Sequence, residues 1–247
     1  PKTFPLAVGW GEDFEDPEAL LRDLKNENKT EGAAVSAESR YEDLKNALSS
    51  VKLLLENGTA GKAVGQMRFY LCGEGGQGVQ SLADLLIKVS SSRYGFNSPW
   101  YEPEVTKART VAAVTLSENP FVNPNPEAGE VDVLVCMTPQ MYFEKKHFVR
   151  KGGLVIVDSQ GVDLKNGQYD YTLITVPAMN LAASQVKERR SANMVFLGVL
   201  NEALELFSDE VVEKTIRHLI PSAAEQNLQA YRLGRNFLAT SGLKPDR

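Results

Sequence analysis

Cysteine and histidine are scarce in this 247-residue sequence, which contains two of each. Cys72 and Cys136 lie in apolar, strand-like runs, where a free thiol behaves as a small buried hydrophobe, so we expect no disulfide framework. Two cysteines without Cys-x-x-Cys spacing also exclude an iron–sulfur cluster held by this chain alone. His147 and His218 are far apart in the sequence, and we find no nucleophile-elbow motif. We therefore expect neither a metal site nor a catalytic residue in this chain.

Long hydrophobic runs and an excess of positive charge are also lacking. No apolar segment approaches the roughly 18 to 20 residues that span a bilayer, and the N-terminal stretch lacks the pattern of a signal peptide. These absences predict a soluble, cytoplasmic protein with no membrane partner. The net charge of -5 argues against a nucleic-acid partner, and we find no cluster of basic residues with interleaved aromatic residues.

The chain does contain alternating strand-like and helix-like segments from residue 68 onward, which is typical of an α/β fold. Because the strand-like segments are almost continuously apolar, both faces of the sheet should be covered. We predict a three-layer α/β/α sandwich with a largely parallel sheet over residues 67–247. The expected strands are 68–73, 110–117, 131–137, 153–159 and 171–177, and the expected helices are 78–92, 139–148, 178–188, 193–207, 209–219 and 222–239.

Residues 1–66 differ from the rest, and we interpret them as an N-terminal helical extension. Helical patterns occur at 17–26, where Pro17 suits a first turn, and at 40–58, where apolar residues recur at three- and four-residue steps. Two helices cannot bury their apolar faces alone. We therefore expect the extension to pack on the rest of the chain or on an additional subunit.

A glycine-rich loop follows the first expected strand, in the stretch FYLCGEGGQGVQ. Closely spaced glycines allow positive φ angles and the close approach of a neighbour. The amide groups at the start of the next helix favour an anion or a polar oxygen. The candidate cofactor-binding residues in this loop are Gly73, Gly75, Gly76, Gln77 and Gly78.

The spacing Gly-x-Gly-x-x-Gly admits three interpretations. An independent NAD- or FAD-binding Rossmann-type domain would need an acidic residue at the end of a second strand, about 20 residues further on. That region reads SSRYGFNSPWYEPEVTK, in which Glu102 and Glu104 lie in a proline-broken loop without an apolar strand. A tight turn without a ligand is the second interpretation, and a loop that contacts a partner is the third.

The longer string Gly-x-Gly-Gly-Gln-Gly-Val resembles the gamma subunit, or gamma domain, of the 2-oxoacid:ferredoxin oxidoreductases, which act on pyruvate, 2-oxoglutarate or aromatic 2-oxoacids. Other stretches resemble the same family in the same order. They are SSRYGFN, YEPEV, EVDVLVCMTPQMYFEKKHFVRKGGLVIVDS, SANMVFLGVLNEAL and AEQNLQAYRLGRNF. Together they cover about residues 68–237, whereas residues 1–66 lie outside the resemblance.

The resemblance implies a non-autonomous enzyme subunit. The whole complex would convert a 2-oxoacid and coenzyme A to an acyl-CoA, CO2 and a reduced acceptor. Alpha, beta and delta-type subunits would hold thiamine diphosphate, Mg²⁺ and [4Fe-4S] clusters, and this chain would bind no cofactor alone. The particular 2-oxoacid stays open, as does the electron acceptor, which is either ferredoxin or NAD used through a flavin subunit. A non-catalytic scaffold with the same fold is a further alternative.

One loop departs from the family pattern. Members usually continue Pro-Glu with Met-Arg-Gly-Gly, whereas Pro103 and Glu104 are followed here by VTKAR. Lys107 and Arg109 are then the positive charges that suit a phosphate of coenzyme A or a substrate carboxylate, with salt bridges at a subunit seam as the alternative. We expect this loop and the glycine loop to lie at the carboxyl ends of adjacent strands, where ligands of open α/β sheets bind. Both loops would then close the thiamine and coenzyme A side of a partner subunit.

Two other polar residues have local interpretations. Asn193 is expected to cap its helix. Asp158 ends an expected strand, where it either binds a ligand or caps the following turn.

Overall fold

The computed structural model describes residues 65–90, 94–102, 109–120, 123, 125–159 and 169–242. All of these residues belong to one unit of the chain, Lys52–Arg247. The predicted extension over residues 1–66 therefore lies outside the described residues, except for its last two positions.

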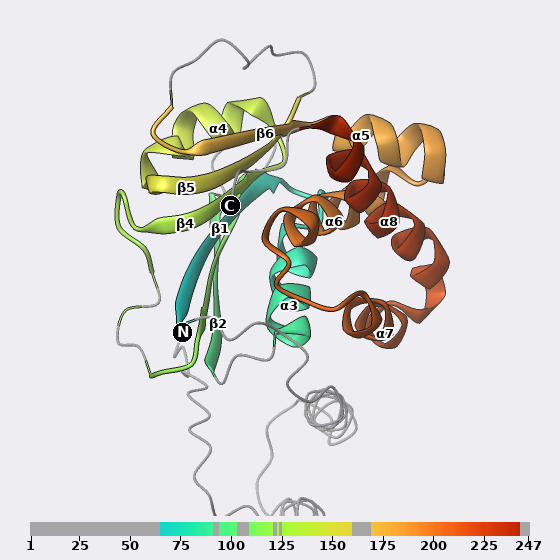
Figure 1. Cartoon of the computed structure of the whole chain (residues 1–247), viewed down its shortest axis with the longest axis horizontal. Helices are drawn as coiled ribbons and strands as arrows, with labels where there is room; N and C mark the ends of the chain where they lie inside the picture. Colours follow the sequence, from blue (N-terminus) through green and yellow to red (C-terminus); the bar gives the residue numbers. More distant parts are fainter. Residues whose placement is uncertain are drawn as a thin grey trace, which may run out of the picture. The chain divides into compact units, whose positions relative to one another are not determined.

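A six-stranded sheet forms the centre of the described region (Figure 1). Its strands are β1 (Gln66–Glu74), β2 (Tyr94–Glu102), β3 (Arg109–Ser117), β4 (Val131–Cys136), β5 (Val149–Asp158) and β6 (Thr172–Val176). Their order in space is β2-β3-β1-β4-β5-β6. The strands β1, β4, β5 and β6 are parallel, whereas β3 pairs antiparallel with both β1 and β2. The predicted α/β class is confirmed, and the sheet is mixed and mostly parallel.

The strand β2 was not predicted, and the expectation of a loop in this region is wrong. Within the described part of the chain, β2 lies at the edge of the sheet and pairs with β3 alone. An edge strand tolerates a proline, here Pro99, because one side of its backbone needs no ladder hydrogen bonds. Gly95 and Phe96 are exposed, so β2 lacks the continuous apolar run by which the other strands were predicted. On its inner side, the Asn97 side-chain amide donates to Gln80 Oε1 at 3.3 Å.

Helices cover the two faces of the sheet unequally (Figure 1). Alternate residues of β1 point to opposite faces, so that Phe69 and Leu71 enter the larger core while Tyr70 and Cys72 enter the smaller one. The larger core includes residues of α3 (Val79–Val89), α5 (Ala178–Leu181), α6 (Ala192–Leu204), α7 (Asp209–Leu219) and α8 (Ala224–Ser241), and the smaller core includes residues of α4 (Pro139–Lys145). Helices thus lie on both faces, but one of the two layers is thin.

Short turns complete several predicted helices. They are η1 (Lys146–Phe148), the π-helical turn η2 (Ala182–Val186), η3 (Arg189–Ser191) and η4 (Pro221–Ala223). Among the described helices, none combines the length and the apolar composition that a membrane span requires.

The helices α6 and α8 touch through two glycines. A Cβ atom on Gly198 would overlap the carbonyl oxygen of Tyr231, and a Cβ atom on Gly234 would overlap that of Val195. The two backbones are therefore in direct contact, which any side chain at these positions would prevent. Both glycines belong to stretches that carry the family resemblance, so helix packing explains their place in the pattern.

Tyr231 joins α8 to α6 and to α7 through its hydroxyl group. This group donates to Asp209 Oδ1 at 2.5 Å and accepts from Asn201 Nδ2 at 2.7 Å. Burial and the hydrogen bond to Asp209 raise the pKa of Tyr231 above its ordinary value of 10.0. The phenol therefore stays neutral and belongs to the interior.

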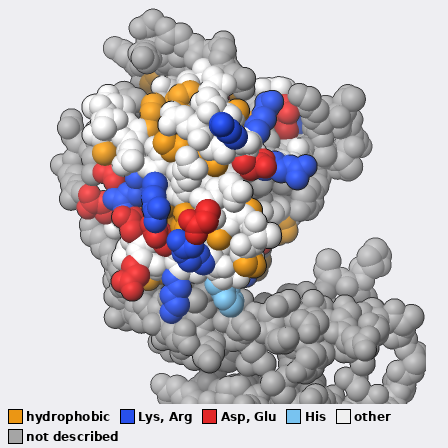
Figure 2. Space-filling model, turned by 90° about the vertical axis from the view of Figure 1, so that its right-hand side faces the viewer, with side chains coloured by type: hydrophobic (Ala, Val, Ile, Leu, Met, Phe, Trp, Pro, Cys, Tyr) orange, Lys and Arg blue, Asp and Glu red, His pale blue; other side chains and the backbone are white. Residues whose placement is uncertain are grey.

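The outer surface of these helices carries both signs of charge, and Figure 2 shows the acidic and basic side chains interspersed on this side of the molecule. Arg235 forms ion pairs with Glu202 and Asp209, and Arg232 forms one with Glu213. These pairs connect different helices. The surface is therefore a solvated face whose charges are largely matched within the chain.

Candidate functional site

The glycine loop follows β1 and is held in shape by Gln77. The Gln77 Oε1 atom accepts a hydrogen bond from the backbone N–H of Glu74 at 2.7 Å, and the Gln77 backbone N–H donates to the Glu74 carbonyl oxygen at 3.2 Å. A Cβ atom on Gly73 would lie 2.6 Å from Gln77 Oε1, so the side chain folds back only because residue 73 is a glycine. The loop is therefore closed by its own side chain.

Gly78 connects the loop to α3, and Asn193 of α6 forms a hydrogen bond with Gly78. Gly78 is left-handed, with φ 81°, and its carbonyl oxygen accepts a hydrogen bond from Asn193 Nδ2 at 3.3 Å. A Cβ atom on Gly78 would overlap the Asn193 amide. The expectation that Asn193 caps its helix is wrong, because Ser191 occupies the cap position of α6. The buried Asn193 instead connects α6 to the glycine loop.

The tip of the loop is open. Gly75 and Gly76 are exposed. Gly76 has φ 85°, and no atom lies within 4 Å of the place where its Cβ would be. Another molecule can therefore approach the backbone here, beside the first amide groups of α3, where the helix dipole favours negative charge or a polar oxygen.

Arg109 lies at the same end of the sheet as the glycine loop. In the strand register, Glu74 at the end of β1 faces Arg109 at the start of β3, which faces Glu102 at the end of β2. The connection between β2 and β3 therefore leaves and re-enters the sheet at this end. Glu104 and Lys107 belong to this connection and lie outside the described residues. We expected the two loops to follow adjacent strands. This is wrong for β1 and β2, because β3 lies between them.

Arg109 forms an ion pair with Glu144 of α4. Its Nη1 atom is 2.8 Å from Glu144 Oε2, and the two side chains are 26% and 30% exposed. The predicted positive charge is thus partly neutralised within the chain. A phosphate at this position has to bind beside Glu144 or displace it.

The two cysteines lie directly behind the loop. Cys72 and Cys136 face each other across β1 and β4, and their Sγ atoms are 3.3 Å apart. Both are buried, and neither forms a disulfide in this structure. Burial is the main cause that raises the pKa of Cys136 well above its ordinary value of 9.0, so its thiol stays neutral.

Asp158 caps the next element rather than presenting itself to a ligand. Its buried Oδ2 atom accepts a hydrogen bond from the backbone N–H of Met179 in α5 at 3.0 Å. Across the described ranges, no three side chains of His, Cys, Asp or Glu are close enough together to hold a metal ion.

The strand order does not provide a dinucleotide site. In a Rossmann domain, the strand that follows the glycine loop and its helix lies next to the first strand. Here the strand that follows α3 is β2, and β3 separates it from β1. Glu102, at the end of β2, is two strand spacings from the glycine loop, or about 10 Å instead of about 5 Å. The end of β2 is therefore one strand further from the glycine loop than the strand that carries the acidic residue in a Rossmann domain.

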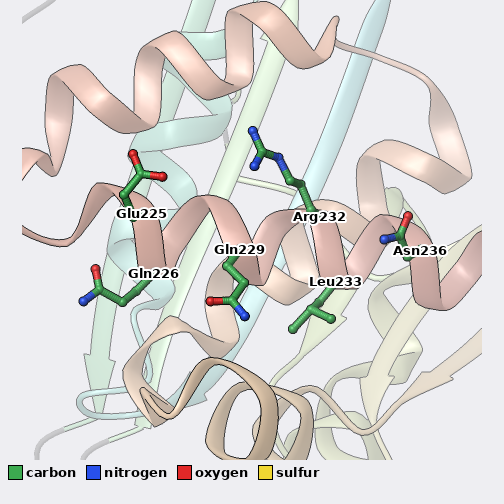
Figure 3. Close-up of a pocket in the computed structure, with 6 residues that line it drawn as sticks. All are labelled: Glu225, Gln226, Gln229, Arg232, Leu233 and Asn236. Atoms are coloured by element: carbon green, nitrogen blue, oxygen red, sulfur yellow. The ribbon is translucent and has the colours of Figure 1, made fainter.

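An open hollow of about 530 Å³ lies along the outer side of α8 (Figure 3). Gln229 Nε2 donates to the Gln185 carbonyl oxygen at 3.1 Å, and Arg232 pairs with Glu213. We assign no ligand to this hollow, because Gln229 and Arg232 at its centre serve contacts within the chain. The residues that line it are Glu225, Gln226, Gln229, Arg232, Leu233 and Asn236.

A comparison with protein families defines the class of this chain. Residues 68–237 match the model of the family described as pyruvate ferredoxin/flavodoxin oxidoreductase, and this range includes the glycine loop, the sheet and most of α8. The chain belongs to this family. It is a gamma subunit of the 2-oxoacid:ferredoxin oxidoreductase type, so it is an enzyme subunit.

Curated relatives and solved structures agree with this class. The 2-oxoglutarate synthase subunit KorC of Methanocaldococcus jannaschii is 31% identical over 170 residues, which are 66% of this chain and 89% of that protein. The gamma subunit of a keto/oxoacid ferredoxin oxidoreductase from Geobacter sulfurreducens PCA has a TM-score of 0.60 at 22% identity, over 70% of this chain and 98% of that one.

A larger relative contains this fold as one part. The 2-oxoglutarate:ferredoxin oxidoreductase from Magnetococcus marinus, solved with 2-oxoglutarate, coenzyme A and succinyl-CoA bound, has a TM-score of 0.62 at 21% identity. The match covers 74% of this chain and 32% of that chain. At these sequence identities, the solved structures show that the fold is shared.

Two residues that shape the site, Glu144 and Asn193, could not be assigned their roles from the sequence. Glu144 gives no signal of its own in the sequence, because its role depends on how α4 packs near the start of β3. Asn193 was noticed, but its position at the start of a helix suggested a cap. Its partner Gly78 is 115 residues away in the sequence.

Proposed function

We propose that the glycine loop and the β2–β3 connection line the coenzyme A side of an active site that partner subunits complete. The reaction of the complex would be the oxidation of a 2-oxoacid with coenzyme A to an acyl-CoA and CO2, with reduction of an acceptor. Thiamine diphosphate, Mg²⁺ and [4Fe-4S] clusters would be bound by alpha, beta and delta-type subunits and would supply the carbanion and electron-transfer chemistry.

One observation carries this proposal: the glycine loop, which has an open tip, follows β1 at the end of the sheet where β2 ends and β3 begins. The tip at Gly75 and Gly76 lets a partner or a ligand approach the backbone. The strand register places Arg109 beside the end of β1, where the loop begins. Family membership adds the expectation that this subunit works beside others.

The role of these residues would be binding and orientation rather than chemistry. Coenzyme A carries phosphate groups, which a guanidinium group recognises through charge-assisted hydrogen bonds. The open amides at the start of α3 would favour a second oxygen of the same ligand. Because Glu144 already pairs with Arg109, ligand binding would exchange one anionic partner for another.

Among 2-oxoacids, 2-oxoglutarate is the first substrate to test. Curated relatives are named 2-oxoglutarate synthase subunits, and a solved structure with the same fold is a pyruvate oxidoreductase subunit from Thermotoga maritima. A purified complex assayed with both 2-oxoacids would distinguish them by kcat/KM.

The decisive experiment replaces Lys107 and Arg109 with alanine in the purified complex and measures the KM for coenzyme A. Loss of a charged contact to phosphate costs about 1.5–3 kcal/mol, so we expect the KM to rise by about 10- to 100-fold. Glu144→Gln is the matched control, because it removes the ion pair but keeps the arginine. An unchanged KM in the double variant, or an equal rise in Glu144→Gln, would refute the coenzyme A role in favour of a structural ion pair.

A further inference from the structure

A cationic groove lies at the end of the strands opposite to the glycine loop. It is a hollow of about 840 Å³ at the start of β5 and just before β6. We define the cationic groove by its basic and aromatic lining residues, which are Lys146, His147, Arg150, Lys151, Tyr169 and Tyr171.

The expectation that the chain has no basic cluster with interleaved aromatic residues is wrong. The stretch KKHFVRK, residues 145–151, contains four Lys or Arg in seven residues and no acidic residue, within a chain whose net charge is -5. Folding then places Tyr169 and Tyr171 beside it, from a segment that follows in the sequence. The basic run is visible in the sequence, whereas its proximity to the two tyrosines depends on the fold.

The positive charge of the groove is only partly matched within the described part of the chain. Arg150 forms an ion pair with Asp132, and Asp170 contributes one acidic side chain to the lining. Lys146 and Lys151 are exposed, and neither forms an ion pair with another described residue. Two lysine charges are therefore available to an anionic partner.

The aromatic wall of the groove is fixed in place. The hydroxyl groups of Tyr142 and Tyr171 are 2.9 Å apart and hydrogen-bonded, and the rings of Tyr169 and Tyr171 are stacked with their centroids 5.3 Å apart. The backbone N–H of Gly152 donates to the Asp170 carbonyl oxygen at 2.6 Å, which joins the start of β5 to the approach to β6. A partner would therefore meet a surface that is already ordered, and ordering costs less binding energy on such a surface.

We propose that the cationic groove is the docking site for an acidic segment of a partner protein. Carboxylates of that segment would pair with Lys146 and Lys151, and an apolar side chain would lie against the tyrosine wall. Phe143 lies next to the groove on α4 and is 53% exposed, with the Lys146 Nζ atom 5.9 Å from its ring centroid. Tyrosine and arginine are enriched in protein–protein interfaces, and the lining contains Arg150, Tyr169 and Tyr171.

Charge decides between the possible polyanions. A nucleic acid would meet the repulsion of the whole acidic chain, because its phosphates extend far beyond one local groove. A short acidic segment meets the groove alone, and its carboxylates complement the two lysines. An acidic protein segment is therefore favoured over nucleic acid.

This inference is independent of the proposed role of the glycine loop. The strands β1, β4, β5 and β6 are parallel, so the glycine loop at the end of β1 and the groove at the start of β5 lie at opposite ends of the sheet. Loss of docking at the groove would leave the KM for coenzyme A unchanged, and failure of the coenzyme A proposal would leave docking intact.

The test uses the full chain and a matched pair of charge reversals. The groove variant is Lys146→Glu with Lys151→Glu, and the control is Arg189→Glu with Lys214→Glu, two exposed residues outside the groove lining. Both double variants change the net charge equally. Fluorescence anisotropy would measure the binding of a labelled poly-glutamate peptide and of a DNA duplex, and thermal unfolding would verify that both variants fold.

We expect the groove variant to bind the peptide about tenfold more weakly than the wild type, because two exposed ion pairs become repulsions. The control should stay close to the wild type. An equal loss in both variants, or a DNA duplex that binds more tightly than the peptide through the same lysines, would overturn the proposal.

Cross-linking extends the test to the native assembly. Carbodiimide treatment of the purified complex should join Lys146 or Lys151 to an Asp or Glu side chain of another chain. If other cross-links between chains form and none includes these lysines, the groove is not a docking site.

Discussion

Replacing Gly198 with alanine tests the contact between α6 and α8. The new methyl group would overlap the carbonyl oxygen of Tyr231 and approach the backbone nitrogen of Arg235 at 2.9 Å. Both obstacles are backbone atoms of α8, which cannot turn aside as a flexible side chain can. The helices have to move apart, and Val195 and Val199 on the same helix would lose part of their packing.

The expected cost follows from two opposing effects. Overpacking in a well-packed core costs about 1–3 kcal/mol, and more when the backbone has to shift. Alanine in place of glycine in a helix interior stabilises the helix by about 0.5–1 kcal/mol. We expect Gly198→Ala to lower the free energy of unfolding by about 2 kcal/mol, which corresponds to a fall in Tm of about 4–8 °C for a domain of this size.

Thermal unfolding of the full chain, followed by circular dichroism, measures this change. Gly65→Ala is the control, because no atom lies within 4 Å of its added Cβ, and it should stay within about 0.5 kcal/mol of the wild type. Gly234→Ala should cost a similar amount to Gly198→Ala. The double variant should cost less than the sum, since the first substitution already separates the helices. A Gly198→Ala protein that melts at or above the wild-type Tm would show that helix propensity outweighs the contact, and the close approach would be refuted.

Three further predictions concern the loop and the buried polar groups. Gly78→Ala combines a positive φ angle with a clash against Asn193, so it should lower the Tm by about 2–4 °C for each kcal/mol lost, and an unchanged Tm would contradict the role given to Asn193. Tyr231→Phe removes the hydroxyl that bonds to Asp209, which should cost about 1–2 kcal/mol in urea unfolding; a cost near zero would mean that the buried network contributes nothing. Because the pKa of Cys136 is raised in the folded state, its contribution to stability is complete below its ordinary pKa of 9.0 and is lost as the pH rises further. Urea midpoints between pH 7 and pH 10 should therefore fall less steeply in Cys136→Ala than in the wild type, and equal slopes would count against this reasoning.

Four of the five strands that the sequence predicted share one property. The strands β1, β3, β4 and β5 are apolar runs with few interruptions, because side chains on both of their faces are buried, and the runs could be recognised directly. The strand β2 escaped recognition because it lies at an edge, where Pro99 and an exposed Phe96 are tolerated. Missing it also meant missing the antiparallel pairs around β3.

The candidate site was predicted in outline for a similar reason. The glycines of the loop stand out in the sequence. The structure explains several of them by a positive φ angle or by a close neighbour that a Cβ atom would overlap. The contacts that complete the site are different, because they join elements that are distant in the sequence. Two examples are the hydrogen bond from Asn193 to Gly78 and the ion pair between Arg109 and Glu144. Both depend on how distant elements pack, and no local sequence pattern predicts such contacts.

The edge strand β2 has a consequence for the subunit before it joins a complex. A free strand edge is a template on which a second copy can add its own strand, and this is a common route to aggregation. Pro99 removes one backbone donor from β2, and Gly95 lies inside the strand, which makes a regular added ladder harder to form. The same irregularity that concealed β2 in the sequence would thus help newly made chains to remain separate until their partner subunits arrive.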